Sequence, residues 1–355
     1  GIDPVLMIEK YSADAVRFSL LMLASEGQDV NLSESRFEMG RNLSNKIWNA
    51  YRLLSLNTGD TKLGPRPADV ADLPEEELAD RWIKSRYFQT VRKVTDGLEQ
   101  YRLHEAIASI YDFFWHDYCD WYLELIKRRV GRDAPRQSRT IPLQIATGVM
   151  EGCMLLLHPF MPFITEEIWQ SIGMRETDSI MVTPWPSTRD DAIDPKAESD
   201  MKLLQESINA IRNIRGEVSV PPRKKVNLVF KPENERTARL LDEHRHYISD
   251  CTGADEILIS SDAAIPKPAA RAFPPGTEIH VPLAGIIDIA RERERLDKEL
   301  GRAESEIAAH DKKLSNENFL SRAPDHVVEM TRRRREELSQ KAEKLKESIA
   351  HLRES

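Results

Sequence analysis

The chain has 355 residues, of which 40% are hydrophobic and 31% are charged, and its formal net charge is −8. This length predicts two to four domains, and the hydrophobic content suffices for packed cores. The acidic total does not exclude a polyanionic partner, because such a partner is bound by a local basic stripe and not by net charge. Residues 206–231 hold six Lys or Arg against two Glu, whereas residues 60–80 hold seven acids against two cations.

Cysteine use and hydropathy exclude several classes of protein. Cys119, Cys153 and Cys251 are widely spaced and odd in number, which indicates reduced thiols in a cytoplasmic protein and not a disulfide-stabilised secreted one. No Cys or His pair has the spacing of a zinc site, so no metal is expected. No signal peptide is visible, and no segment is expected to be long and apolar enough to span a membrane.

Helical patterns dominate the first half of the chain. Residues 1–32 predict a short helical connector, and residues 33–190 predict a helical bundle, because long amphipathic segments follow one another with short loops between them. A loop containing Gly and Pro is expected over residues 58–72, and Pro74 is expected to open the helix after it. The other helices are expected at residues 5–10, 13–24, 33–56, 103–129, 141–157 and 163–172.

Residues 191–285 change in periodicity and predict a small α+β module. Alternating and β-branched apolar residues indicate three strands and two helices. The strands are expected at residues 226–230, 256–260 and 277–283, and the helices at residues 196–215 and 233–250. Residues 263–276 contain four prolines and are expected to be a linker that passes over the surface.

Residues 286–355 predict two helices that form a coiled coil. Apolar or tolerated residues recur at alternating three- and four-residue steps, which places one narrow apolar seam on each helix. The seam residues are Ile289, Leu296, Leu300, Ala303, Ile307 and Leu314, then Val328, Leu338, Ala342, Leu345, Ile349 and Leu352. The polar stretch between the helices favours an antiparallel hairpin, with a coiled coil between two chains as the alternative. The expected fold class is therefore mainly α.

No catalytic constellation emerges from the sequence. There is no Gly-rich phosphate loop, no nucleophile elbow and no metal-binding helix motif. Asp117, Asp120 and Glu124 share one helix face, as paired catalytic carboxylates would. Charged outer faces of bundle helices produce the same pattern, so no catalytic residue is assigned.

Two segments are compatible with either core packing or nucleic-acid contact. The aromatic block at residues 111–122 repeats at helical spacing and predicts core packing, with Trp115 and Tyr122 partly exposed at its edge. Residues 41–49 hold two cations and three amides, groups that hydrogen-bond phosphates and base edges. The same amides could equally cap or bridge neighbouring helices inside the bundle.

Several runs of residues occur in a fixed order along most of the chain. They are Gly1-Ile2-Asp3-Pro4 with Tyr11 to Phe18, Gly40-Arg41-Asn42 with Asn45-Lys46-Ile47-Trp48-Asn49-Ala50, Asp120-Trp121-Tyr122-Leu123-Glu124, His158 to Trp169, and Ile211-Arg212 with Ile214-Arg215, Val220-Pro221-Pro222 and Lys225. The first run resembles the stretch that follows the lysine-rich ATP-binding signature of the class I aminoacyl-tRNA synthetases for aliphatic amino acids. The others resemble the anticodon-binding region of the same family.

Residues 286–355 indicate which of these synthetases the chain resembles most. Their hairpin, with Asn316-Glu317-x-Phe319 and Ala323-Pro324-x-x-Val327-Val328, resembles the valyl-tRNA synthetases. The isoleucyl enzymes, which often end in a Cys-rich zinc module, are the alternative. The resemblance implies the C-terminal half of such an enzyme, without ATP-binding signatures or editing domain, so the chain itself is expected to be non-catalytic and to hold no cofactor. The longer enzyme would use ATP to activate valine and would esterify the 3′ end of tRNA(Val).

The resemblance also implies that the bundle reads the anticodon loop and that the hairpin packs on the outer corner of tRNA. Residue chemistry and motif position then give the candidate contacts. These are Arg41, Asn42, Asn45, Lys46 and Arg52 for the anticodon loop, Arg212, Arg215, Lys224 and Lys225 for phosphates, and Arg332, Arg333 and Arg334 for the corner. Arg335 is less suitable because it lies on the predicted seam. The expected protein is a monomer that binds tRNA(Val) and no membrane, and a coiled-coil interaction module without an RNA role is the competing hypothesis.

Overall fold

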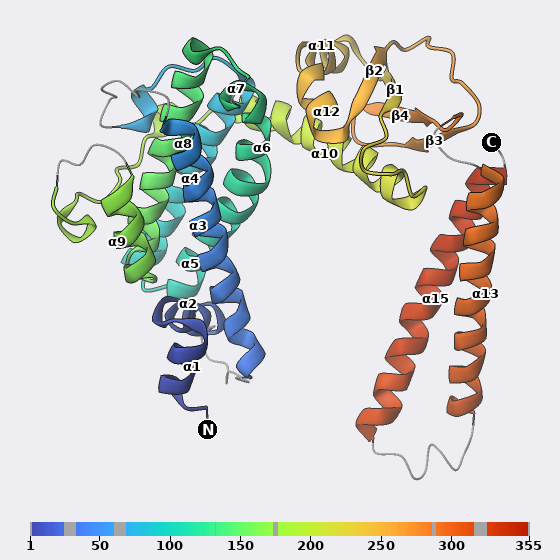
Figure 1. Ribbon diagram of the computed structural model, residues 1–355, viewed down its shortest axis with the longest axis horizontal. Coiled ribbons are helices and arrows are strands. Elements are labelled where there is room, and N and C mark those ends of the chain that lie inside the picture. Colours follow the sequence, from blue (N-terminus) through green and yellow to red (C-terminus); the bar gives the residue numbers. More distant parts are fainter. Residues whose placement is uncertain are drawn as a thin grey trace. The chain divides into compact units, whose positions relative to one another are not determined.

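A computed structural model describes residues 2–24, 33–59, 69–131, 133–172, 177–285, 289–315 and 325–353. The chain forms two compact units, residues 1–202 and residues 203–355 (Figure 1). The first unit is a helical bundle, and the second contains a four-stranded sheet with its helices and a helical hairpin. The mainly α fold expected from the sequence is confirmed.

The bundle contains long helices close to the positions that the sequence predicts. They are α1 (Pro4–Tyr11), α2 (Ala13–Leu23), α3 (Glu38–Thr58), α4 (Leu78–Glu99), α5 (Leu103–Asp112), α8 (Arg136–Leu157) and α9 (Pro162–Ser171), with 3₁₀ turns η1 (Glu34–Phe37), η2 (Val70–Asp72), η4 (Ile180–Val182) and η5 (Asp190–Ala192). The prediction that Pro74 opens the helix after the loop is wrong, since α4 begins at Leu78. A capping box sets this start, and in it the Asp80 carboxylate accepts a hydrogen bond from the Glu77 N–H at 3.1 Å.

The aromatic block lies on a π-helical stretch, η3 (Phe113–Tyr122), followed by α6 (Leu123–Leu125) and α7 (Lys127–Val130). Core packing is confirmed for rings such as Phe114, and Trp115 is partly exposed as predicted. The prediction of partial exposure is wrong for Tyr122, which is fully buried. A π-helix closes hydrogen bonds from residue i to i+5, so a step of seven residues no longer returns to the same face.

Helix α8 is the apolar centre of the bundle. Among the described residues, one helical segment, Gln137–Leu157, is long and apolar enough to cross a membrane, which corrects the expectation that the chain has none. Its apolarity has a different cause, because 72% of the apolar window is buried inside the protein. Leu143, Val149 and Cys153, for example, are fully buried against other helices.

Helix α3 lies very close to α2. A Cβ atom at Gly40 would be 2.3 Å from the carbonyl oxygen of Ala15, so only glycine allows this approach. The Gly40 N–H donates to the hydroxyl of Ser19 at 3.2 Å. From the same helix α2, the Asp14 carboxylate accepts a hydrogen bond at 2.7 Å from the N–H of Ile164 in the first turn of α9. Helix α2 therefore fixes both α3 and α9.

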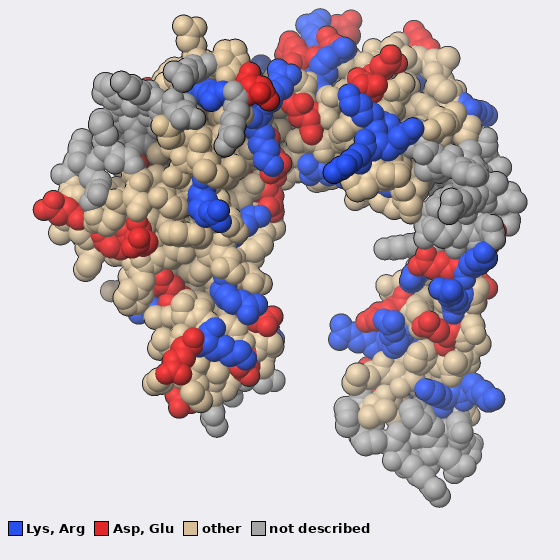
Figure 2. Space-filling view, viewed as in Figure 1, with Lys and Arg blue, Asp and Glu red and all other residues tan. Residues whose placement is uncertain are grey.

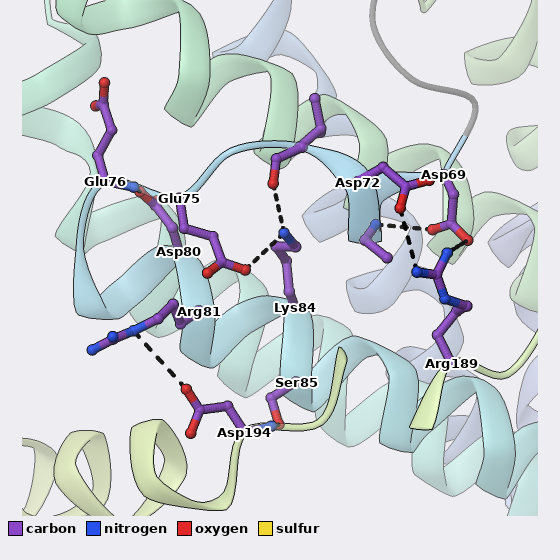
Figure 3. A network of polar contacts seen from close by, with 12 residues as sticks. Asp69, Asp72, Glu75, Glu76, Asp80, Arg81, Lys84, Ser85, Arg189 and Asp194 are labelled. Atoms are coloured by element: carbon purple, nitrogen blue, oxygen red, sulfur yellow. Dashed lines mark hydrogen bonds and ion pairs between the residues drawn. The ribbon is translucent and has the colours of Figure 1, made fainter. Parts of the chain in front are cut away.

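Residues 69–77, which precede α4, form ion pairs with Lys and Arg side chains of the bundle (Figure 3). The Lys84 side chain is 3% exposed, and its ammonium lies 2.7 Å from the Glu75 carboxylate. The Arg189 guanidinium lies 3.2 Å from Asp69 at the other end of the segment. Part of the local acidic excess is thus engaged in internal ion pairs.

The fully buried carboxylate of Asp80 depends on one arginine. Nη1 of Arg129 lies 2.9 Å from both carboxylate oxygens, and Nη2 lies 2.7 Å from Glu76. The Tyr122 hydroxyl donates to the same carboxylate at 3.2 Å. Burial raises the pKa of Asp80, and the Arg129 charge opposes that rise.

The second unit begins inside α10 (Pro195–Glu217) and contains a sheet with the strand order β2-β1-β4-β3. Strand β1 pairs in parallel with β2 and antiparallel with β4, which also pairs antiparallel with β3. The elements are β1 (Val226–Pro232), α11 (Glu235–Glu243), α12 (Arg245–Thr252), β2 (Ala254–Ile259), β3 (Ala269–Ala272) and β4 (Thr277–Pro282).

Two predictions for this module need correction. The expected linker at residues 263–276 contains β3, whose alanines give no alternating apolar pattern and which pairs with β4. The expected helix at residues 233–250 is two helices that meet at His244. The other predicted strands and helices of the module are confirmed within a few residues.

Helices α13 (Ile289–Leu314) and α15 (Asp325–Arg353) pack along each other as the predicted antiparallel hairpin. Ala303, Leu338, Ala342 and Ile349 are buried in the seam. Ion pairs flank it, joining Arg335 to Asp311 at 3.0 Å, Lys341 to Glu299 at 2.7 Å and Lys346 to Glu304 at 3.2 Å. Residues 316–324 and the side chains of Ile289, Leu296, Leu345 and Leu352 lie outside the described residues.

We expect Arg129→Met to destabilise the bundle by about 3–5 kcal/mol, because it leaves the buried Asp80 carboxylate without its cation. The measurement is urea unfolding followed by tryptophan fluorescence, which reports on this unit alone because all six tryptophans lie within residues 1–202. The exposed neighbour gives a matched control, Arg128→Met, which should change stability by less than about 0.5 kcal/mol.

The same variant should show a pH dependence. Without Arg129 the folded-state pKa of Asp80 rises further above its unfolded value, so the folded state binds the proton more tightly. The stability deficit relative to the unsubstituted chain should therefore be smallest at acidic pH. It should grow as pH rises from the folded-state pKa of Asp80 with Arg129 present to the higher folded-state pKa without it. A deficit that is independent of pH would show that altered packing, and not an unpaired charge, causes it.

We expect Gly40→Ala to destabilise the bundle by about 1–3 kcal/mol, because the added methyl group must push the backbones of α2 and α3 apart. Gly59→Ala, at the end of the same helix, is the control, since its Cβ atom would lie 3.5 Å from the nearest atom. Urea unfolding would contradict this expectation if the two variants had equal midpoints.

Candidate nucleic-acid interface

Helix α3 divides into a buried and an exposed face. The buried face holds Leu43, Ile47, Ala50 and Leu54. The exposed face holds residues spaced by three or four positions, which we call the α3 stripe: Arg41, Asn42, Asn45, Trp48, Asn49 and Arg52. Trp48 is 41% exposed although it is a large aromatic residue, and its ring lies 5.3 Å from that of Tyr51. The stripe thus offers amides, guanidinium groups and an indole on one rigid helix.

The five candidate anticodon contacts differ in their surroundings. Asn42, Asn45 and Arg52 are exposed on the α3 stripe. Arg41 is 44% exposed, and its guanidinium lies 5.6 Å from the centre of the Tyr11 ring. All four are therefore accessible to a ligand.

Lys46, the fifth candidate, is engaged inside the bundle. Its ammonium lies 2.5 Å from the Asp120 carboxylate and 4.9 Å from the centre of the Trp115 ring. An ammonium over an indole face is attractive, so Lys46 ties η3 to α3 and holds the partly exposed Trp115 beside the stripe. The Lys46 ammonium is therefore engaged in contacts within the bundle and is less available to a ligand than the other four candidates.

The three carboxylates that share a helix face contact different cations. Asp117 accepts a hydrogen bond from Arg86 at 2.9 Å, and Glu124 accepts one from Lys127 at 2.7 Å, while Asp120 holds the ammonium described above. Burial raises the pKa of Asp117, and the Arg86 charge opposes that rise. These contacts account for the carboxylates as members of ion pairs. Within the described part of the chain, no group of three His, Cys, Asp or Glu side chains could hold a metal ion.

Two arginine candidates of the module point to the main chain. Nε of Arg212 donates to the carbonyl oxygen of Cys251 at 3.1 Å. Nη2 of Arg215 donates to carbonyl oxygens of residues 218–225, which we call the basic loop. Both guanidinium groups therefore stabilise the module itself.

The lysine candidates lie on the basic loop and are exposed. Lys225 is 3.0 Å from Asp255, whereas Lys224 has no ion-pair partner among the described residues. Arg223 is also exposed and equally without a described partner. Figure 2 shows Lys and Arg side chains gathered on one face of the module, while on the visible face of the hairpin they alternate with acidic side chains.

The arginine run of the hairpin, Arg332–Arg334, is exposed on α15. Arg333 and Arg334 lie 3.5 and 3.2 Å from Glu337, so their charges are partly balanced along the helix. Arg335 pairs instead with the facing helix, which agrees with its predicted place on the seam.

The structure adds Trp48, Asn49 and Arg223 to the candidate contacts. Trp48 and Asn49 lie between the buried Ile47 and Ala50, so helical spacing alone could have placed them on the exposed face. Arg223 could have been found as the first cation of a run of three.

Two family models match parts of the chain. Residues 80–230 match the anticodon-binding domain of tRNA ligases, and residues 288–353 match the valyl tRNA synthetase tRNA binding arm. A solved LeuRS–tRNA ternary complex from Agrobacterium radiobacter is similar at a TM-score of 0.42 and 20% identity, over 63% of this chain and 28% of that one, which is too weak to establish a shared fold.

Curated relatives match along nearly the whole chain. The valine–tRNA ligase of Geobacillus stearothermophilus is 39% identical over 99% of this chain and 39% of its own length. Those of Symbiobacterium thermophilum and Enterococcus faecalis are 37% and 38% identical, over 99% of this chain and 40% and 39% of their own lengths. The chain thus spans about two fifths of the length of these relatives, and along nearly its whole length it is homologous to valine–tRNA ligases.

Proposed function

We propose that this chain is the tRNA-recognition part of a valine–tRNA ligase and that its partner is tRNA(Val). The observation that carries the proposal is the hairpin that matches the valyl tRNA synthetase tRNA binding arm. The same chain matches an anticodon-binding domain from residue 80 to residue 230, and the α3 stripe of its bundle carries amide, guanidinium and indole groups. The match to the valyl arm favours valine over isoleucine as the amino acid of the longer enzyme.

In this proposal the α3 stripe contacts the anticodon loop. Single-stranded loops present splayed bases, which proteins bind by stacking on aromatic rings and by hydrogen bonds to base edges. Trp48 supplies a ring, Asn45 and Asn49 supply amides, and Arg52 supplies a guanidinium, all from one helix. Trp115 lies next to this helix through Lys46 and extends the aromatic surface.

The basic loop and the hairpin contact the remainder of the tRNA in different ways. The exposed cations of the loop suit phosphates, because helical RNA is recognised through its backbone and shape. From residue 290 to residue 355 there are sixteen Lys or Arg and fifteen Asp or Glu, so the hairpin has almost no net charge. Its contact with the tRNA corner then depends on the shape of the hairpin and on individual exposed cations such as Arg332.

The chemical step belongs to the longer polypeptide in this proposal. That polypeptide activates valine with ATP and esterifies tRNA(Val) in the cytoplasm. This chain contributes RNA contacts and no reacting group. We further infer that it acts as a monomer, because the hairpin seam is filled by α13 and α15 of one chain.

The test of the proposal is binding of the 355-residue chain to tRNA(Val) and to tRNA(Ile) transcripts. Tighter binding of tRNA(Val) supports the valine assignment, and equal affinity would leave only the general tRNA role. Sedimentation with and without tRNA separates this proposal from the coiled-coil interaction module. A stable dimer that ignores tRNA would overturn the proposed function.

We expect Trp48→Ala to weaken binding of tRNA(Val) by ~1–3 kcal/mol, because one stacked base loses its aromatic partner. Tyr101→Ala is the matched control, since Tyr101 is an 87% exposed aromatic residue of the same unit that lies off the α3 stripe. A short anticodon stem-loop RNA should show the same difference in a fluorescence titration. Equal affinities of the two variants would exclude stacking on Trp48.

We expect Lys224→Ala to reduce the slope of log affinity against log salt by about 1, because one phosphate is no longer neutralised by the protein. Lys225→Ala should reduce the slope less, since the Lys225 ammonium is already 3.0 Å from Asp255. Filter binding of tRNA(Val) at several salt concentrations measures both slopes. An unchanged slope in Lys224→Ala would remove the basic loop from the interface.

A further inference from the structure

Arg215 forms an unusual set of hydrogen bonds near the end of α10. Its Nη2 donates to the carbonyl oxygens of Pro221, Pro222 and Lys224 at 3.1, 3.4 and 3.0 Å. The described residues place no carboxylate within ion-pair distance of this guanidinium, and its Nη1 is buried without a hydrogen-bond partner. Burial lowers the pKa of Arg215, which fits a cation held against carbonyl groups and not against an acid.

The basic loop folds tightly around this guanidinium. The Val220 N–H donates back to the carbonyl oxygen of Arg215 at 2.8 Å, and the Lys224 N–H donates to that of Pro221 at 2.9 Å. Ser219 adopts a φ of 53°, in the left-handed region that a non-glycine residue rarely occupies. Val218 and Val220 are each 8% exposed. The loop is therefore a defined turn, and hydrogen bonds from Arg215 hold its residues 221–224.

This arrangement separates two kinds of cation. The Arg215 guanidinium faces the inside of the turn, where a phosphate has no access to the buried Nη1. Arg223 and Lys224 of the same turn are exposed to solvent, and neither has a described ion-pair partner. Because Lys224 contributes its carbonyl to Arg215, the inner contact fixes the backbone from which the outer charge projects.

We propose that Arg215 is a positioning residue that holds Arg223 and Lys224 in place for the phosphate backbone of the bound RNA. The inference rests on the proposed function, since it assigns the loop a role in binding tRNA. The two N–H groups of Nη2 are shared among the three carbonyl oxygens, and a cation near a helix C-terminus is favoured by the helix dipole. A loop that is ordered before binding loses less conformational entropy in the complex.

A double-mutant cycle on the full chain tests this role. The variants are Arg215→Met, the pair Arg223→Ala with Lys224→Ala, and the triple combination, each titrated with tRNA(Val) at several salt concentrations. We expect Arg215→Met alone to weaken binding roughly 10-fold and to lower the salt slope by about 2, one for each phosphate that the misplaced loop cations no longer neutralise. In the background without the loop cations, Arg215→Met should weaken binding no further.

Other outcomes would overturn the inference. Additive effects on affinity, with a slope change of about 1 for Arg215→Met in both backgrounds, would show that Arg215 itself contacts the RNA. Unchanged binding by the variant without the loop cations would show that the loop lies off the RNA, even though the chain binds tRNA. No tRNA binding by the unsubstituted chain would overturn the proposed function, and this role with it.

Limited trypsin digestion gives an RNA-independent readout, because Arg223, Lys224 and Lys225 are exposed cleavage sites. At a temperature well below its thermal unfolding, Arg215→Met should be cleaved faster within residues 223–225, and Arg215→Lys should lie between the two proteins. Arg239→Met removes an exposed arginine of α11 as the control and should behave like the unsubstituted chain. Equal cleavage rates in all variants would show that Arg215 does not hold the loop.

Discussion

Helix α3 can approach α2 closely only because Gly40 lacks a side chain, and the surface of the bundle depends on this contact. The approach places the Gly40 N–H on the Ser19 hydroxyl and commits one face of α3 to the core, so that the opposite face meets solvent. Helix α2 also caps the start of α9 through Asp14. A stripe of polar groups on a helix held in this way is pre-organised, which base recognition requires of its contact residues.

Placement of charge, and not its total, distinguishes the surfaces of this protein. Many cations of the bundle are engaged with acids, as Lys84 is with Glu75 and Arg129 is with Asp80. Such pairs stabilise the fold but leave little positive potential for a polyanion. Exposed cations without a described partner, such as Lys224 and Arg332, are therefore more informative about binding than the net charge of −8.

Helical spacing was sufficient to predict most helices and the antiparallel hairpin, because each of these is determined by local periodicity. The sequence failed where another interaction decides the structure. Strand β3 exists through its pairing with β4, and Tyr122 is buried because η3 is π-helical. In the candidate site, Lys46 and Arg215 looked available as ligands. Contacts with Asp120, 74 residues away, and with the carbonyls of a turn engage them instead.

In the proposed recognition of tRNA, the basic loop and the hairpin act through different physical interactions. Residues 206–231 hold an excess of four positive charges, so contacts made there weaken as salt rises. The hairpin is nearly neutral and its two helices are joined by ion pairs along the seam, so its contribution comes from a shaped surface that salt screens little. A nearly neutral arm gains little binding free energy from electrostatic attraction to a polyanion, and most of it from a partner whose shape fits its surface. The match of the hairpin to the valyl tRNA synthetase tRNA binding arm fits this kind of recognition.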